Sequence, residues 1–226
     1  MPPLAVELIP LAIASALIPL PLVVTVLLLR SEAGKASGVM WVGGQIAARL
    51  AQGLVIALLL DRADAGAGDA ATNGPVLATL LVVLGVLFYV LAARKALNAP
   101  DEDAPPPRWM TGLETAAPGR AFLLGAGLMV ISIKFWVFTL SATGAIAYAN
   151  LGTGQAIGAY LGWVLGAVSL QILLVVAALA VPARADVLLA RVGDLLARYS
   201  RPLLIAVGLI FGTIFLTEGL VGLGIL

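Results

Sequence analysis

Residues 119–149, GRAFLLGAGLMVISIKFWVFTLSATGAIAYA, are apolar enough to enter a bilayer but carry Lys134 near their middle. A helix needs about 20 residues to cross the hydrocarbon, so this segment is long for one straight span, and we expect a bent or broken helix. A lysine at mid-bilayer costs roughly 2.5–3.5 kcal/mol on insertion scales, and it normally faces a protein-lined or wet interior with a partner. Lys134, with Ser132 close by, is therefore the first candidate site residue.

The composition indicates a polytopic membrane protein. Of the 226 residues, 62% are hydrophobic and only 11% are charged, which excludes a soluble domain whose surface must be solvated. The chain has no cysteine and no histidine, so disulfides, thiolate chemistry, haem ligation and the usual zinc sites are excluded. The sequence contains no nucleotide-binding motif either. We expect no enzymatic activity, no catalytic residue, no metal or other cofactor, and no nucleic-acid partner.

Polar links separate six apolar segments, which are residues 4–29, 38–60, 75–93, 119–149, 154–181 and 202–225. Each segment is about long enough to cross a bilayer as a helix. We therefore predict an all-α protein with six transmembrane helices in a single membrane domain, residues 1–226. The longest links are 61–74 and 94–118; the second contains DEDAPPP and should form a mobile cytoplasmic loop.

Lysine and arginine are distributed unevenly over the links. Ten of the 13 lie in or beside the first, third and fifth links, one lies in the second, and two lie inside segments. Because cytoplasmic loops carry the excess of basic residues, these odd-numbered links should be cytoplasmic and both termini should face outward. In the fifth link, residues 184–199 (RADVLLARVGDLLARY) repeat an arginine every seven residues opposite an apolar side. This pattern predicts an amphipathic helix, which either lies on the cytoplasmic leaflet as a topology anchor or anionic-lipid contact, or extends the fifth span.

The first segment contains three prolines. Pro10, Pro19 and Pro21 each lack a backbone donor, so the helix should kink or open there. The alternative to a functional opening of the helix is a kink that serves only helix packing.

The second segment carries one polar face. Gln45, Arg49 and Gln52 are spaced by four and three residues, which places them on the same side of a helix. This face should point into the helix bundle, where it either contacts a substrate or forms an interhelical hydrogen-bond cluster that fixes packing. Glu218, late in the sixth segment, should reach the outer interface, or it could turn inward toward the cations.

Arg49 and Lys134 are both expected at mid-membrane depth, and no Asp or Glu is expected at the same depth. Two uncompensated cations in a low dielectric repel each other and are poorly solvated, unless water, carbonyl groups or an anionic ligand offsets them. A carboxylate or phosphate on a substrate would fit, whereas a cationic substrate would need a site lined with carboxylates. The predicted substrate-binding residues are Lys134, Arg49, Gln45, Gln52, Ser132, Pro19 and Glu218.

Two stretches resemble the family of glycopeptidolipid- and sulfolipid-addressing proteins. Residues 16–44 (ALIPLPLVVTVLLLRSEAGKASGVMWVGG) are similar to the family's opening, and residues 131–226 are similar to its second half, including the closing GLIFGTIFLTEGLVGL. The chain departs from the family in having Ile18-Pro19 in place of Asn-Pro and Ser132-Ile133-Lys134 in place of Asn-Pro-Lys. If those asparagines bind substrate in relatives, the substrate or the mechanism differs here.

The resemblance extends to the lysine-exporter superfamily and implies an inverted repeat of two three-helix halves. These halves would be residues 1–93 and 119–226, joined by loop 94–118, with the first and fourth segments as counterparts. In such folds the site lies near the midplane between broken helices. The resemblance implies a multi-pass protein of the bacterial inner membrane that exports cell-envelope lipids or glycolipids, and the two cations independently imply an anionic or polar head group.

Two other functions stay open, namely an exporter of amino acids or other small solutes and a non-transporting accessory subunit of a lipid-synthesis or export complex. The expected partners are membrane lipids, an anionic or amphipathic small molecule, and either a second copy of the chain or an envelope-biosynthesis protein. Gly154, Gly158, Gly162 and Gly166 recur every four residues, which would allow close helix packing within or between chains.

Overall fold

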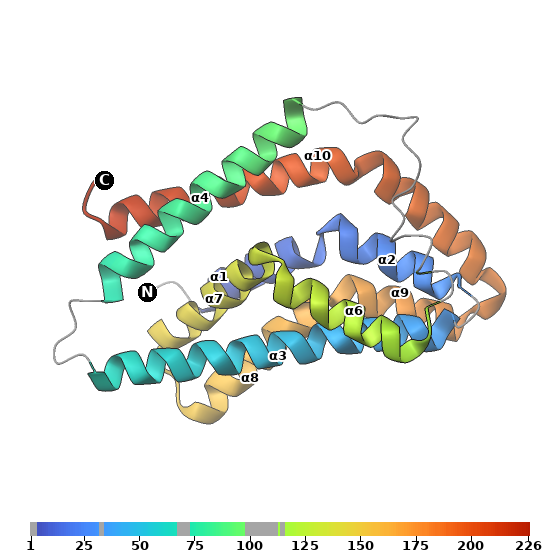
Figure 1. The fold of residues 1–226 in the computed structure, drawn as a ribbon, viewed down its shortest axis with the longest axis horizontal. Coiled ribbons are helices and arrows are strands. Elements are labelled where there is room, and N and C mark those ends of the chain that lie inside the picture. The colour runs from blue at the N-terminus through green and yellow to red at the C-terminus, as the bar shows by residue number, and fades with distance from the viewer. Residues whose placement is uncertain (1–3, 32–33, 67–72, 98–112, 114–115) are drawn as a thin grey trace. The chain divides into compact units, whose positions relative to one another are not determined.

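The computed structural model describes residues 4–31, 34–66, 73–97, 113 and 116–226, and these are helical apart from short turns. The predicted all-α class is confirmed. Along the described residues the helices (Figure 1) are α1 (Leu4–Ala16), α2 (Pro19–Leu29), α3 (Gly34–Gly66), α4 (Asn73–Leu97), α6 (Pro118–Ile131), α7 (Ile133–Tyr148), α8 (Thr153–Ala167), α9 (Ser169–Ala180) and α10 (Pro182–Gly222). Most of the predicted mobile loop 94–118 lies outside the described residues.

The first apolar segment consists of two helices, α1 and α2, which are bent by 51°. Ile18 has φ −62° and ψ 119°, the extended conformation that a residue before proline favours. Pro19 is the first residue of α2 and Pro21 lies in the same turn, where backbone N–H groups have no acceptor within the helix, so neither proline costs a hydrogen bond. The predicted opening is confirmed at Pro19, whereas Pro10 lies inside α1 without ending it.

The fourth segment is broken, as its length predicted. Ser132 lies between α6 and α7 with an extended backbone (φ −87°, ψ 107°), and the two helices are bent by 73°. Neither neighbour of Ser132 is proline or glycine. The break therefore has to be held by contacts elsewhere in the fold.

Two side chains satisfy backbone carbonyl groups at the end of α6. Trp136 Nε1 donates to the carbonyl of Val130 (2.8 Å), and Gln52 Nε2, from α3, donates to the carbonyl of Met129 (2.9 Å). An unpaired carbonyl group at membrane depth costs several kcal/mol. These two bonds therefore stabilise the break at Ser132.

The fifth segment is also broken, which the sequence analysis did not predict. Helices α8 and α9 are bent by 62°, and Val168 between them has φ −113° and ψ 8°. Gly166 lies two residues before Val168, and Ser169 follows it directly. Glycine and serine near each other are a common cause of sharp kinks, so this pair is the sequence signal that could have revealed the break.

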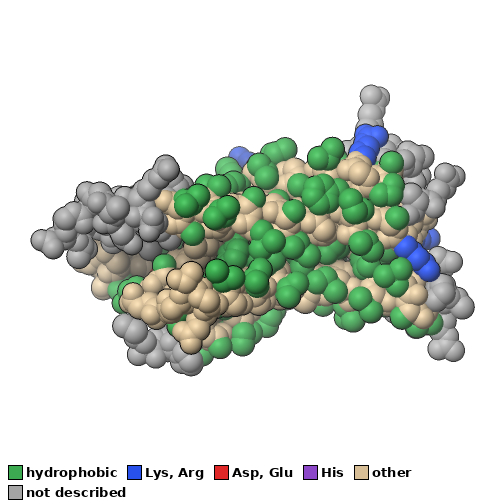
Figure 2. Space-filling model, turned by 90° about the horizontal axis from the view of Figure 1, so that it is seen from below, with side chains coloured by type: hydrophobic (Ala, Val, Ile, Leu, Met, Phe, Trp, Pro, Cys, Tyr) green, Lys and Arg blue, Asp and Glu red, His purple; other side chains and the backbone are tan. Residues whose placement is uncertain are grey.

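Two of the six predicted spans have the length and composition to cross a membrane as single helices, and up to five do if each bent pair is one span. Two are straight, Gly34–Leu58 in α3 and Arg201–Gly222 in α10, and the other three are the bent pairs, each counted as one span. Hydrophobic side chains cover much of the described surface on the face that Figure 2 shows, and Ile131 is 84% exposed, as expected of a lipid-facing surface. The third predicted span, 75–93, lies in α4 (Asn73–Leu97), part of which lies outside the residues compared in this way, so its crossing stays a prediction. The six-span count, the orientation and the inverted repeat stay predictions.

The contacts divide the chain into two compact units. The first consists of Met1–Ala57 and Pro105–Arg198, and the second of Leu58–Ala104 and Tyr199–Leu226. Helices α1, α2 and α6–α9 belong to the first unit and α4 to the second, while α3 and α10 contribute to both. The single domain with halves at 1–93 and 119–226 stays a prediction.

The predicted amphipathic helix 184–199 lies within α10, which continues without interruption into the sixth apolar segment. Val181 (φ −129°, ψ 65°) separates α10 from α9. The helix is therefore not an extension of the fifth segment, which was one of the two expected arrangements.

In the first unit, α3 and α6 approach closely at two glycines. A Cβ atom on Gly44 of α3 would overlap the backbone of Phe122, and one on Gly125 of α6 would overlap the backbone of Trp41. Small residues at facing positions let two helix backbones come together, which is how helices commonly associate in membranes. This contact fixes α6 against α3.

The second unit packs α4 against the last part of α10 in a similar way. Gly85 and Gly219 each face backbone atoms of the opposite helix, and Tyr89 Oη lies 2.7 Å from Thr213 Oγ1. Arg201 donates to the carbonyl groups of Lys95 (3.1 Å) and Ala96 (2.8 Å). Carbonyl groups at the C-terminal end of a helix lack partners within that helix, so Arg201 caps α4.

Candidate functional site

Arg49 lies in the interior of the first unit with only 1% of its surface exposed. Its Nη2 donates to Ser15 Oγ on α1 (2.7 Å), and its guanidinium carbon lies 5.3 Å from the ring centroids of both Phe135 on α7 and Trp163 on α8. The hydroxyl of Tyr160 on α8 donates to the Arg49 carbonyl (2.5 Å). Residues from α1, α7 and α8 therefore surround a cation carried by α3.

The guanidinium is incompletely satisfied. Its Nε and Nη1 atoms are buried and have no hydrogen-bond partner among the residues described. Burying an ion costs several kcal/mol, and each desolvated ring face returns about 2 kcal/mol. Two rings and one hydrogen bond to Ser15 therefore return an amount of similar size, but the donors on Nε and Nη1 stay unpaired among the residues described. An anion with several oxygen atoms would accept hydrogen bonds from these two nitrogen atoms.

Lys134 is half-buried in the first turn of α7, directly after the break at Ser132. Its Nζ lies 5.2 Å from the centroid of the Phe135 ring, which is also the ring that Arg49 contacts. The two cations predicted to share a depth therefore meet at one aromatic side chain. Like charges repel in a low dielectric, and a negatively charged ligand would relieve the repulsion.

The two glutamines of the predicted polar face are engaged with other helices. Gln52 Oε1 accepts a hydrogen bond from Thr139 Oγ1 (3.1 Å), while its Nε2 holds the Met129 carbonyl at the break. Gln45 and Gln171 on α9 exchange two amide hydrogen bonds of 2.6 and 3.2 Å. Both glutamines therefore form interhelical hydrogen bonds, which was the expected alternative to a contact with substrate. Arg49, on the same face, keeps donors for a ligand.

The other predicted site residues have different surroundings. Pro19 is buried at the start of α2, and Ser132 is half-buried at the break between α6 and α7. Ser15, which binds Arg49, lies three residues before Ile18, so the break of the first segment is close to the cation along the chain. Glu218 is exposed on α10 in the second unit. Its inward contact stays a prediction.

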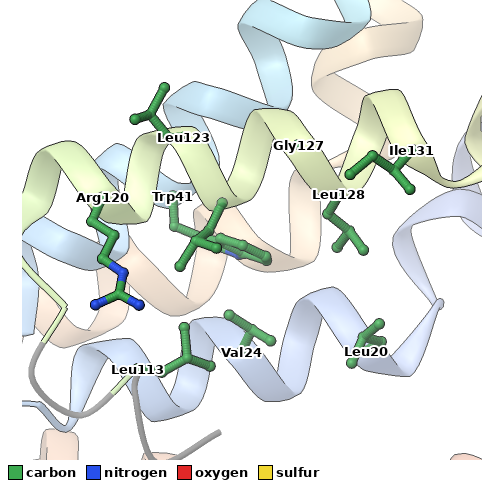
Figure 3. A pocket seen from close by; sticks show the side chains of 10 residues that line it. Leu20, Val24, Trp41, Leu113, Arg120, Leu123, Gly127, Leu128 and Ile131 are labelled. Carbon is green, nitrogen blue, oxygen red and sulfur yellow. The ribbon is translucent and has the colours of Figure 1, made fainter. Parts of the chain in front are cut away.

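A pocket of about 540 Å³ lies between α2 and α6 (Figure 3), and the sequence analysis did not identify it. Its lining residues, which define the α2–α6 pocket, are Leu20, Val24, Trp41, Leu113, Arg120, Leu123, Leu124, Gly127, Leu128 and Ile131. The α6 members recur at the spacing of one helix face. Because α6 is apolar on all sides, its sequence does not distinguish the face that lines the pocket from the other faces.

A chain of hydrogen bonds fixes Trp41 in the wall of the α2–α6 pocket. Trp41 Nε1 donates to Thr25 Oγ1 on α2 (3.1 Å), and this hydroxyl lies 3.1 Å from Gln171 Oε1. Gln171 is in turn paired with Gln45. The network connects α2, α3 and α9 behind the pocket, so we expect the indole to keep one orientation.

Broken apolar helices with cations between them define this chain as a multi-pass membrane protein. The family model described as Sap, sulfolipid-1-addressing protein, matches residues 8–221, and the chain belongs to this family. The resemblance to sulfolipid-addressing proteins is therefore confirmed, while the more distant relation to lysine exporters stays a prediction. No curated protein and no solved structure matches the chain.

Proposed function

We propose that this protein binds an amphipathic lipid with an anionic head group and moves it within the membrane on its way to the cell envelope. The observation that carries the proposal is the buried Arg49 guanidinium, whose Nε and Nη1 atoms have no acceptor among the residues described and which shares the Phe135 ring with Lys134. The family is described by a sulfolipid, and a sulfate group offers several oxygen atoms to a guanidinium. The substrate class follows from this match of charge and geometry.

The breaks in the helices support movement of a ligand rather than a static contact. Irregular backbone at membrane depth is tolerated where it is buried in protein or lines a cavity, and transporters bind substrates at discontinuous helices. Ser15 and Phe135, which contact Arg49, each lie three residues from a break residue, Ile18 or Ser132. A change at either break would therefore alter the contacts of the cation.

The experiment measures transbilayer movement in vesicles that contain the purified full-length chain alone. The probe is a fluorescent sulfated glycolipid, and its unsulfated counterpart is measured in parallel. We expect the wild type to move the sulfated lipid, and Arg49→Gln and Lys134→Gln each to slow it by about tenfold or more, because each removes a charge-assisted contact. Lys95→Gln, an exposed lysine in the second unit, is the matched control and should retain the wild-type rate.

Two results would overturn the proposal. Equal movement of the sulfated and unsulfated lipids would show that the cations do not select the head group. Absence of movement by the folded wild-type chain would favour the accessory-subunit alternative.

A further inference from the structure

The α2–α6 pocket has the chemistry of a lipid-binding groove. Apolar side chains of α2 and α6 face each other across it, with the buried indole of Trp41, 3% exposed, behind them. Its volume of about 540 Å³ lies within the range of small-molecule binding sites. In a membrane protein such a groove is reached by lipid, so an acyl chain is the occupant whose chemistry matches the walls.

The two ends of the α2–α6 pocket differ in charge. Arg120, an exposed cation near the start of α6, lies at one end beside Leu113, whereas Leu20, Leu128 and Ile131 line the other end (Figure 3). An occupant with one negatively charged end and one apolar end would place its charge at Arg120. This asymmetry matches an anionic lipid and does not match a fully apolar one.

The length of the pocket also agrees with one leaflet of a bilayer. Arg120 and Ile131 are 11 residues apart in the same helix, which corresponds to about 16 Å at the rise of an α-helix. One leaflet accounts for half of a hydrocarbon core that is about 30 Å thick. Ile131, at the apolar end of the pocket, directly precedes Ser132 in the chain, and Lys134 follows two residues later.

We propose that the α2–α6 pocket is a loading site for a lipid with an anionic head group, which binds at Arg120 while one acyl chain lies along α6 toward Ser132. The binding itself does not need transport; the assignment as a loading site rests on the proposed function, since the lipid would pass from here to Lys134 and Arg49.

The fluorescence of Trp41 measures whether a lipid occupies the pocket. The full-length chain is placed in phosphatidylcholine vesicles that contain a small share of a lipid with brominated acyl chains, either phosphatidylglycerol or phosphatidylcholine. The quenching of tryptophan fluorescence is measured in the wild type and in Trp41→Phe, and the difference between them is the contribution of Trp41. Because Trp41 is buried in the pocket wall, a brominated chain must enter the pocket to quench it strongly. We expect about tenfold stronger apparent binding for the anionic lipid.

Two variants and their controls test the site. Gly127→Leu should fill the pocket and remove the quenching of Trp41, and a Cβ atom at Gly127 meets no atom within 4 Å, so the fold should be preserved. Arg120→Gln should remove the preference for the anionic lipid. Gly144→Leu on α7, also in open space, and Lys95→Gln are the controls and should behave as the wild type.

The outcomes separate this proposal from the proposed function. Equal quenching of Trp41 by both lipids, or quenching that survives Gly127→Leu in the folded protein, would overturn the loading site even if sulfated lipid is still transported. Selective quenching without transport in the vesicle assay would establish the lipid site and overturn the proposed transport.

Discussion

At the scale of single residues, the burial of Arg49 is expected to lower the free energy of unfolding. A buried cation without a counter-ion is costly, and replacing buried ionic groups by apolar residues of similar size is often neutral or stabilising by about 1–4 kcal/mol. The contacts to Phe135, Trp163 and Ser15 return part of this cost. We infer that the residue is retained for binding and not for folding.

The first prediction is that Arg49→Met leaves the free energy of unfolding of the ligand-free protein unchanged or raises it by up to about 4 kcal/mol. Thermal unfolding in detergent, followed by intrinsic fluorescence, measures the change. In the wild type, a sulfated glycolipid at about 100 times its Kd should stabilise by about 2.7 kcal/mol, and the variant should show no such increase. A Tm well below that of the wild type, with the ligand response intact, would assign Arg49 a structural role.

The second prediction concerns Gln52, which joins α3 to the break in the fourth segment. Gln52→Leu should destabilise the protein by about 1–3 kcal/mol, because the Met129 carbonyl loses its donor at a buried position. A shift in Tm of about 2–4 °C per kcal/mol is expected for a chain of this size. Gln155→Leu, at an exposed glutamine of α8, is the matched control and should stay within about 0.5 kcal/mol of the wild type. If both variants unfold at the wild-type temperature, Gln52 does not hold the break.

The spacing of Gln45, Arg49 and Gln52 predicted that they share one helical face, but it did not distinguish their roles. The distinction depends on partners far along the chain, namely Gln171 for Gln45 and the Met129 carbonyl for Gln52. A spacing rule applies within one helix and cannot indicate which atoms of other helices lie opposite. The contact of both cations with the Phe135 ring could not be predicted from the sequence either, because it depends on how α7 packs against α3.

At the scale of helices, the three broken segments differ in how much the sequence reveals. Pro19 fixes the first break through its own geometry, so that break is local and predictable. Ser132 has no such neighbour, and its break is held by Trp136 and Gln52; only the length of the segment indicated it. Val168 lies between Gly166 and Ser169, which is a weak signal in a chain with 25 glycines.

The third prediction tests the close contact of α3 and α6. Gly125→Val should destabilise the first unit by at least about 1–3 kcal/mol, because its side chain would overlap the backbone of Trp41. Gly127→Val, two residues along the same helix, places the same side chain in open space and should be tolerated. Thermal unfolding of the two variants compares them directly. Equal Tm values would mean that α6 does not approach α3 through Gly125.

At the scale of the whole molecule, the crossing of α4 decides the topology. The described residues contain two straight candidate spans, or up to five if each bent pair is one span, and the predicted third span in α4 is not tested among them. The distribution of Lys and Arg predicts six spans with both termini outside. With six spans, Lys35 before the second and Gly152 before the fifth lie on opposite sides of the membrane; without a span in α4 they lie on the same side.

The fourth prediction uses the absence of cysteine from the sequence. Lys35→Cys and Gly152→Cys each introduce a single thiol at an exposed position, and a Cβ atom at Gly152 meets no atom within 4 Å. In intact cells, a membrane-impermeant maleimide should label the Gly152→Cys thiol, because that link lacks Lys and Arg, and it should label the Lys35→Cys thiol only after permeabilisation. The unsubstituted chain is the control and should stay unlabelled. Labelling of both thiols from one side would mean that α4 does not cross the membrane. The chain would then lack the equal division into three and three spans on which an inverted repeat depends.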